Sequence, residues 1–168
     1  MSSSLVNTRI VPATRDDVPL IRNFILELAE YERAQPGEAP VTEQDLVETL
    51  FGDRPAAEVL IAYLDDEPAG FALFFHNYST WLGKRGIYLE DLFVRPRARK
   101  HGIGFGLLRE LARIAVSRNC GRVDWAVLNW NELAIAFYKQ IGARPLDDWR
   151  TFRLAGDSLA SVAGGEQK

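Results

Sequence analysis

A turn rich in glycine and basic residues follows a strongly apolar segment near the middle of the chain. Residues 87–94 are mostly β-branched, leucine and aromatic, which predicts a buried strand that Pro96 ends. The turn beyond it contains Arg95, Arg97, Arg99, Lys100, His101, Gly102, Gly104 and Gly106. Apolar residues then recur at helical spacing from Leu107 to Ala115. A helix start of this kind offers unpaired backbone N–H groups and the positive end of a dipole, so we expect a ligand that carries phosphate.

Two common phosphate-binding motifs do not match this turn. The P-loop pattern Gly-x-x-x-x-Gly-Lys-Ser/Thr is absent from the sequence. The dinucleotide pattern Gly-x-Gly-x-x-Gly fails because Leu107 or Arg109 stands where the third glycine belongs. The run Arg99-x-x-Gly102-x-Gly104 instead resembles the pyrophosphate-binding signature of the GCN5-related (GNAT) acyl-CoA N-acyltransferases. Taken alone, the motif is also compatible with a capped turn that has a solvated basic face.

Residues 126–143 resemble the second signature of the same superfamily, in which a strand leads into a helix that begins near an Asn and carries Phe-Tyr before a closing Gly. Asn131 suits the N-cap of that helix, and Gly142 suits a left-handed C-cap. One apolar stripe is formed by Leu133, Ala134, Phe137, Tyr138 and Ile141. The two motifs occur in the order and at about the separation that the superfamily has.

The elements around these motifs follow the order strand, two helices, hairpin, strand, helix, strand, helix, strand. We expect strands at 9–12, 59–64, 69–78, 87–94, 123–128 and 149–154, helices at 14–31, 42–51, about 103–118 and from 131, and a loosely held tail at 155–168. The resemblance covers about residues 7–154. It implies one GNAT domain over residues 1–168, with an α/β (mixed α+β) fold whose central, mostly antiparallel sheet is flanked by helices.

Composition excludes several other classes of protein. With 168 residues, 47% of them hydrophobic, the chain is long enough for one domain with its own core. No apolar run approaches the roughly 18 residues of a membrane span, and the first residues lack the pattern of a signal peptide. Cys120 is the only cysteine, so a reducing cytoplasm is the default location. Because the chain contains only two histidines, His76 and His101, in addition to this cysteine, we expect no metal site. A net charge of −3 argues against general nucleic-acid binding.

Shorter motifs resemble one branch of the superfamily, the diamine (spermidine/spermine) N-acetyltransferases. These motifs are residues 27–32, 88–91, 130–132 and 137–139. Residues 78–81, Tyr-Ser-Thr-Trp, are more similar to the thialysine-acetylating relatives, because the polyamine branch carries Asp-Pro-Trp there. A long polyamine needs spaced acids for its ammonium groups and Ser79 supplies none, so we expect a shorter amine. Lys100, where relatives usually have Gly, and Asn129, where the thialysine branch tends to have Asp, are further departures.

Acetyl transfer from a thioester to an amine requires a neutral amine and a protonated leaving thiolate. Because alkyl ammonium pKa values lie near about 10, a base must remove a proton at neutral pH. The resemblance implies that Glu90 is this base and that Tyr138 protonates the departing sulfur. An ordinary Glu, with a pKa of about 4, would need a water relay or a raised pKa. The alternatives are an ion pair for Glu90 and a packing role for Tyr138.

The resemblance also implies the remaining contacts. Glu27, Trp81, Asp91 and Trp149 would line the amine pocket together with Glu90. In a regular strand Asp91 points away from the face of Glu90, whereas a β-bulge would bring both toward the cleft. Backbone N–H groups of Phe93 and Val94 would meet the pantetheine arm and the thioester oxygen. The implied coenzyme-binding residues are Phe93, Val94, Arg99, Lys100, His101, Gly102, Ile103, Gly104, Phe105, Gly106, Asn131 and Tyr138.

These observations predict an N-acetyltransferase that moves acetyl from acetyl-CoA to a primary amine of a small diamine or lysine-like molecule by direct attack. The branch implies a homodimer. One alternative is a GNAT enzyme for a protein N-terminus or an antibiotic amine, which an open peptide groove would favour. The other is a non-catalytic acyl-CoA-binding module, which would need neither Glu90 nor Tyr138.

Overall fold

The computed structural model describes residues 7–165. The chain divides into two compact units, Met1–Ala126 and Val127–Lys168, which we describe separately. Within the described residues the first unit holds one sheet in the order β1-β2-β3-β4-β5, formed by β1 (Thr8–Pro12), β2 (Glu58–Leu64), β3 (Glu67–Ser79), β4 (Lys84–Val94) and β5 (Val123–Trp125). Strands β1 to β4 pair antiparallel, and β5 joins β4 in parallel. The predicted mixed, mostly antiparallel sheet is confirmed.

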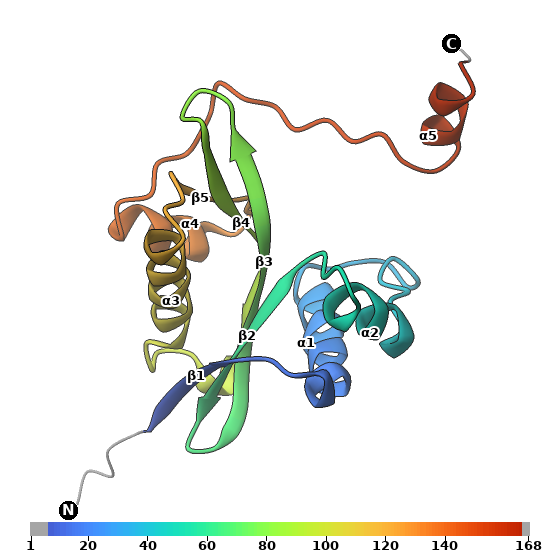
Figure 1. Cartoon of the computed structure of the whole chain (residues 1–168). Helices are drawn as coiled ribbons and strands as arrows, with labels where there is room; N and C mark the ends of the chain where they lie inside the picture. Colours follow the sequence, from blue (N-terminus) through green and yellow to red (C-terminus); the bar gives the residue numbers. More distant parts are fainter. Residues whose placement is uncertain (1–6, 166–168) are drawn as a thin grey trace, which may run out of the picture. The chain divides into compact units, whose positions relative to one another are not determined.

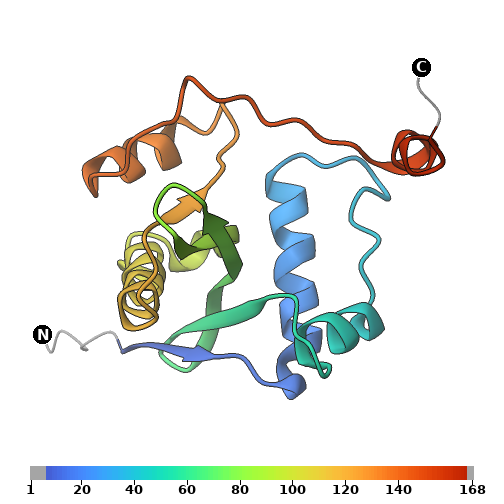
Figure 2. The same cartoon turned by 45° about the horizontal axis from the view of Figure 1, so that its top comes forward.

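Helices cover both faces of this sheet (Figures 1 and 2). Helices α1 (Val18–Tyr31) and α2 (Glu43–Phe51) lie on one face, and α3 (Ile103–Ser117) lies on the other. Capping boxes begin both predicted helical segments: the backbone N–H of Thr14 donates to Asp17 at 2.7 Å, and that of Thr42 donates to Asp45 at 2.8 Å. The first box opens a short 3-10 turn, η1 (Arg15–Asp17), before α1 begins.

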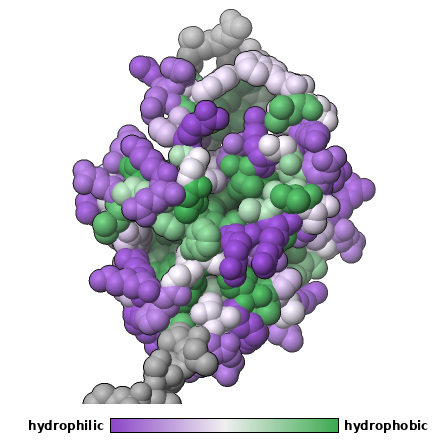
Figure 3. All heavy atoms as spheres, turned by 90° about the vertical axis from the view of Figure 1, so that its left-hand side faces the viewer, coloured by the Kyte–Doolittle hydropathy of each residue, from purple (hydrophilic) through white to green (hydrophobic). Residues whose placement is uncertain are grey.

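Alternating strand residues fill two hydrophobic layers. The layer toward α1 and α2 is formed by Val18, Ile21, Phe24, Leu28, Leu46, Leu50, Val59, Ile61, Phe71 and Phe93. Within it, the rings of Phe24 and Phe71 stack with centroids 5.3 Å apart. The intervening strand residues are buried on the face of α3, and they include Leu60, Ala62, Ala72, Phe74, Ile87 and Leu89. Figure 3, which views the side at the left of Figure 1, shows hydrophobic residues interspersed among hydrophilic ones on the surface.

Strand β4 contains a bulge at Glu90. Leu73 of β3 lies opposite Asp91, and the next residue, Phe74, lies opposite Leu89, so Glu90 has no partner across the ladder. Because of the extra residue, side chains of odd-numbered residues lie on opposite faces of the sheet before and after Glu90. Leu89 lies toward α3, whereas Asp91 lies on the same face as Phe93, toward α1. Of the two alternatives for Asp91, a regular strand and a β-bulge, the structure has the bulge.

The fifth strand is shorter than predicted. The sequence predicts a strand over 123–128, but β5 ends at Trp125. Its last partner is Leu89, directly before the bulge. A bulge bends the strand that carries it, so β4 turns away from β5 at Glu90 and the parallel ladder stops there.

The second unit contains two helices among its described residues, α4 (Glu132–Gln140) and α5 (Gly156–Ala163). One expectation is wrong here. Residues 149–154 pair with no strand of the described chain, and Phe152 is 91% exposed, so the segment lacks both a ladder and an apolar surface to bury its side chains. The segment expected as a loosely held tail contains α5, whose Ala and Leu content and first-turn Asp157 favour a helix and which buries none of its residues.

Candidate active site

The glycine turn opens directly at the N-terminus of α3. Gly102 caps the helix with φ +75°, a conformation that glycine adopts readily, and its carbonyl accepts from the N–H of Gly106 at 2.8 Å. A Cβ placed on Gly102 would meet no atom within 4 Å, and one on Gly104 would meet only Val94 Cγ2, at 3.9 Å. The space beside these two glycines is therefore open to a ligand. Free N–H groups, a helix dipole and close backbone access fit a pyrophosphate.

The basic residues of this turn do different work. Arg99 donates from Nε to the carbonyl of Val94 at 3.0 Å, and its guanidinium lies 4.8 Å from the centroid of the Tyr31 ring. His101 Nδ1 lies 2.9 Å from the carbonyl of Arg99. Lys100 has φ +67°, in the left-handed region that favours glycine. That conformation gives a physical reason for the glycine that the family resemblance leads us to expect at this position.

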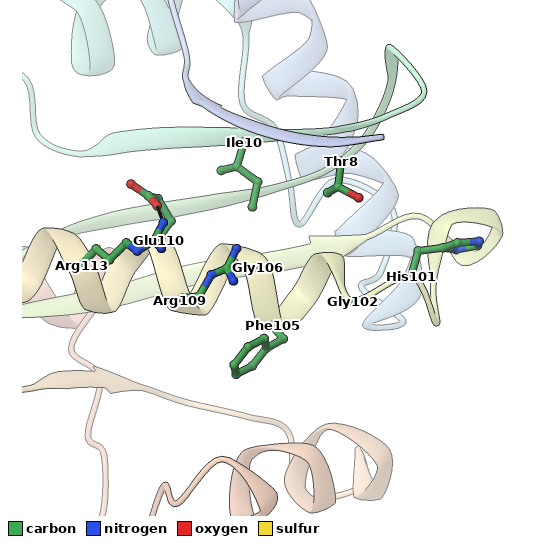
Figure 4. A pocket seen from close by; sticks show the side chains of 9 residues that line it. All are labelled: Thr8, Ile10, His101, Gly102, Phe105, Gly106, Arg109, Glu110 and Arg113. Atoms are coloured by element: carbon green, nitrogen blue, oxygen red, sulfur yellow. Dashed lines mark hydrogen bonds and ion pairs between the residues drawn. The ribbon is translucent and has the colours of Figure 1, made fainter. Parts of the chain in front are cut away.

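A groove of about 350 Å³ runs along α3 beside β1 (Figure 4). It is lined by Thr8, Ile10, His101, Gly102, Phe105, Gly106, Arg109, Glu110 and Arg113. Arg113 pairs with Glu110 at 3.3 Å, and Arg109 extends from the same helix. Positive charge thus continues from the glycine turn along the solvent-exposed side of α3.

The outer edge of β4 presents backbone groups beyond the end of β5. Arg95 donates its N–H to the carbonyl of Ala69 across the β3 ladder. Because paired and outward-facing residues alternate in an antiparallel ladder, the N–H and C=O of Val94 point away from β3, whereas those of Phe93 point toward it. The same alternation turns Leu92 outward. The geometry therefore favours Val94 over Phe93 as a backbone donor. Leu92 is a second candidate donor, which the sequence analysis did not include.

Two carboxylates lie together at the bulge. Glu90 is exposed, whereas Asp91 is partly buried on the α1 face. Burial, followed by the charges of Glu90 and Glu32, raises the pKa of Asp91 to about 6. Burial also raises the pKa of Glu32, which ends α1. An ammonium ion placed among these groups would relieve their mutual repulsion.

Further polar residues share this face, and the sequence analysis did not assign them to the site. Tyr88 lies opposite Phe75, with ring centroids 5.3 Å apart, and beside Asp124 of β5. Burial and then the carboxylates of Glu90 and Asp124 raise the pKa of the Tyr88 phenol. Asp124 accepts from Asn77 Nδ2 at 3.1 Å and pairs with Arg122 Nε at 2.7 Å. The period-two spacing of Tyr88 and Glu90 is the one signal that could have found part of this group.

We call the residues around the bulge, Glu32, Tyr88, Glu90, Asp91 and Asp124, the acceptor face. Two predicted amine-pocket residues of the first unit, Glu27 and Trp81, are not part of the acceptor face. Glu27 is held by Arg95, with its Oε1 2.6 Å from Nη2, and Arg95 also stacks over Phe24. Trp81 is 91% exposed in the turn between β3 and β4.

The second unit carries the remaining predicted residues. Asn131 caps α4 by accepting from the N–H of Ala134 at 3.3 Å, as expected, and Gly142 has φ +87° just beyond the helix. Tyr138 lies on α4 beside Phe137, with ring centroids 5.5 Å apart. Trp149 is 72% exposed, and its N–H bonds to the carbonyl of Leu146.

Residues 25–143 match the family model described as the Acetyltransferase (GNAT) family. The chain belongs to this family and is an acyltransferase enzyme. It is 34% identical to the thialysine N-epsilon-acetyltransferase of Sus scrofa, over 95% of this chain and 99% of that one. It is also 34% identical to an L-ornithine N5-acetyltransferase of Arabidopsis thaliana, over 92% and 87% of the two chains.

Among solved structures, an integron cassette protein from the mobile metagenome of V. cholerae matches with a TM-score of 0.77 and 32% identity, over 93% of this chain and 97% of that one. The resemblance inferred from the motifs is thereby confirmed. The family uses acetyl-CoA as its co-substrate. Within residues 7–165, no helix is long and apolar enough to cross a membrane, and no cluster of three His, Cys, Asp or Glu side chains could hold a metal ion.

Proposed function

We propose that this enzyme acetylates the side-chain amine of a short diamine or a lysine-like amino acid, using acetyl-CoA. The observation that carries the proposal is the acceptor face, where the bulge gathers carboxylates around Asp91 and leaves one of them, Glu90, exposed. Negative charge of this kind favours an ammonium substrate. The names of the thialysine- and ornithine-acetylating relatives support the same class of acceptor.

The first unit would supply residues that contact both substrates. Acetyl-CoA brings the thioester whose carbonyl the amine attacks. The open backbone at Gly102 and Gly104 would hold its pyrophosphate, with Lys100 and His101 nearby, and the outward N–H of Val94 would meet its extended arm. Ile103 is buried, so its share in this contact is its backbone.

Glu90 is the proposed base. It lies at the bulge beside Asp91, where it would accept the ammonium proton directly or through a water molecule. Tyr138 is the proposed acid that protonates the thiolate as it leaves, and Asn131 the proposed contact to the coenzyme arm. Trp81 and Trp149, both exposed, are proposed to contact the amine, and Glu27 would do so while paired with Arg95.

A short acceptor is favoured over a long polyamine. Ser79, which stands where the polyamine branch carries Asp, is 5% exposed, and its Oγ accepts from the N–H of Leu82 in the β3–β4 turn. It therefore adds no charge for a distant ammonium. On the branch resemblance we also propose a homodimer, and on the single cysteine a reducing compartment such as the cytoplasm.

The test of this proposal is a panel of amines with acetyl-CoA and detection of the free thiol. We expect higher kcat/KM for thialysine, lysine, ornithine and putrescine than for spermine. Spermine as the best substrate would refute the preference for short acceptors. Activity with none of these amines, but with a peptide N-terminus or an aminoglycoside, would replace the proposal by the alternative acceptor class.

The catalytic roles need two variants with matched controls. Tyr138→Phe removes one hydroxyl and should lower kcat by about 10²–10⁴-fold in single-turnover measurements, while acetyl-CoA affinity by calorimetry stays unchanged. Glu90→Gln should lower kcat and shift the pH–rate profile. Tyr63→Phe in β2 and Glu43→Gln in the exposed first turn of α2 are the controls. Normal single-turnover rates in Tyr138→Phe would leave that tyrosine a packing role.

A further inference from the structure

A polar cluster lies where β3, β4 and β5 meet, next to the acceptor face. The Asp124 carboxylate receives both the Nδ2 of Asn77, at 3.1 Å, and the Nε of Arg122, at 2.7 Å. Asn77 Oδ1 is buried and has no hydrogen-bond partner among the described residues. Gly86 makes room for the cluster, because a Cβ there would fall 2.3 Å from Asn77 Oδ1 and 3.1 Å from Arg122 Cγ. The absence of a side chain at Gly86 therefore allows Asn77 and Arg122 to pack against the backbone of β4.

Arg122 keeps part of its guanidinium available. Its ion pair to Asp124 runs through Nε, and within residues 7–165 no hydrogen bond engages Nη1 or Nη2. The side chain is 43% exposed. A guanidinium anchored at Nε presents its outer nitrogens as a fork that matches a carboxylate.

The sheet register places this fork on the acceptor side. Asp124 lies beside Tyr88, and the carboxylates of both Asp124 and Glu90 act on that phenol, so Arg122, two residues before Asp124, lies on the same face. The carbonyl of Arg122 bonds to the N–H of Ile87.

The spacing suits a short amino acid. Val123 lies opposite Ile87, so Arg122 is level with Gly86, and from Gly86 to the bulge at Glu90 the strand spans about 13 Å. An ornithine- or lysine-like molecule spans on the order of 7 Å from its side-chain nitrogen to its carboxylate. The arginine and glutamate side chains bridge the remainder.

We propose that Arg122 binds the α-carboxylate of an amino-acid acceptor whose side-chain amine is at Glu90, so that the enzyme distinguishes amino acids from the corresponding diamines. This inference rests on the proposed function. The acceptor face is acidic, so it repels the carboxylate of a substrate unless a cationic side chain pairs with that carboxylate. A diamine carries no such group and makes no use of Arg122.

The experiment compares substrates that differ only in that carboxylate: L-ornithine with putrescine, and L-lysine with cadaverine. In Arg122→Gln, kcat/KM for the amino acids should fall about 10- to 100-fold, as expected for the loss of a charge-assisted hydrogen-bonded pair. The values for the diamines should stay unchanged. Arg122→Lys, which keeps the charge without the fork, should restore part of the loss. Arg85→Gln, an exposed arginine on the opposite face of β4, is the matched control.

The outcomes separate the two proposals. Equal losses for amino acids and diamines in Arg122→Gln, or no loss for either, would overturn the carboxylate site and leave a structural ion pair. Asp124→Asn should lower the amino-acid values without changing acetyl-CoA affinity, since it frees the guanidinium from its anchor. If the wild-type enzyme acetylates the diamines and not the amino acids, the carboxylate site is wrong while the proposed function stands. If it acetylates neither, both fall.

Discussion

Replacing Asp91 by Asn should change how the stability of the protein depends on pH. The folded protein binds a proton at Asp91 more tightly than the unfolded chain does, because the pKa is about 6 in place of 3.8. The stabilisation from this proton is complete below about pH 3.8 and is lost as the pH rises through 6. The difference between the two pKa values corresponds to about 3 kcal/mol. Asn keeps the shape of the neutral carboxyl and never ionises, so it avoids this loss.

The assay is urea unfolding at a series of pH values from 4 to 8, for the wild type and Asp91→Asn. The variant should gain stability relative to the wild type as the pH rises, by about 2.5 kcal/mol between the two ends of the series, because a small part of the loss has already occurred at pH 4. Carboxyls that do not interact with Asp91, such as Asp45, whose pKa the Thr42 hydrogen bonds lower, contribute equally to both proteins and drop out of the difference. The exposed Asp53→Asn is the control. A constant difference across the series would show that Asp91 ionises in the folded protein as it does in the unfolded chain.

Two further substitutions test the glycine turn. Gly104→Val should fold, because its nearest neighbour would be Val94 Cγ2 at 3.9 Å from the new Cβ, but calorimetry should show at least about a tenfold loss of acetyl-CoA affinity, or 1.4 kcal/mol. Unchanged affinity would place the phosphates elsewhere. Lys100→Gly should raise the unfolding free energy by about 1 kcal/mol in a denaturant titration, since Lys100 occupies φ +67°. A loss of stability would show that the lysine side chain contributes more than its backbone strain removes.

Features set by local chemistry could be predicted from the sequence. The Thr14 and Thr42 capping boxes, the Asn131 cap and the glycine turn each depend on residues a few positions apart. The bulge at Glu90 could be named from the sequence only as an alternative to a regular strand, since it is the one arrangement that brings both carboxylates to one cleft.

Features that depend on distant partners could not be predicted. The end of β5 at Trp125 follows from the bend of another strand, and the absence of a strand at 149–154 follows from the lack of a neighbour to pair with. The Asn77–Asp124–Arg122 cluster joins β3 to β5, and only the parallel register of β5 brings these residues together. From the sequence alone, Arg122 and Asp124 are two charges near a turn.

The extra residue in β4 makes the acceptor face a matter of chain length as well as of side-chain identity. Ile87 and Leu89 are buried on one side of the sheet, and Asp91 and Phe93 lie on the other, although all four positions have the same parity. Deleting Glu90 would restore an unbroken alternation and force one of these pairs to change sides, which would carry either two core residues or a carboxylate into the wrong layer. A deletion of one residue here would therefore displace several side chains at once, whereas a substitution changes one. Natural variation in this segment should proceed by substitution at constant length.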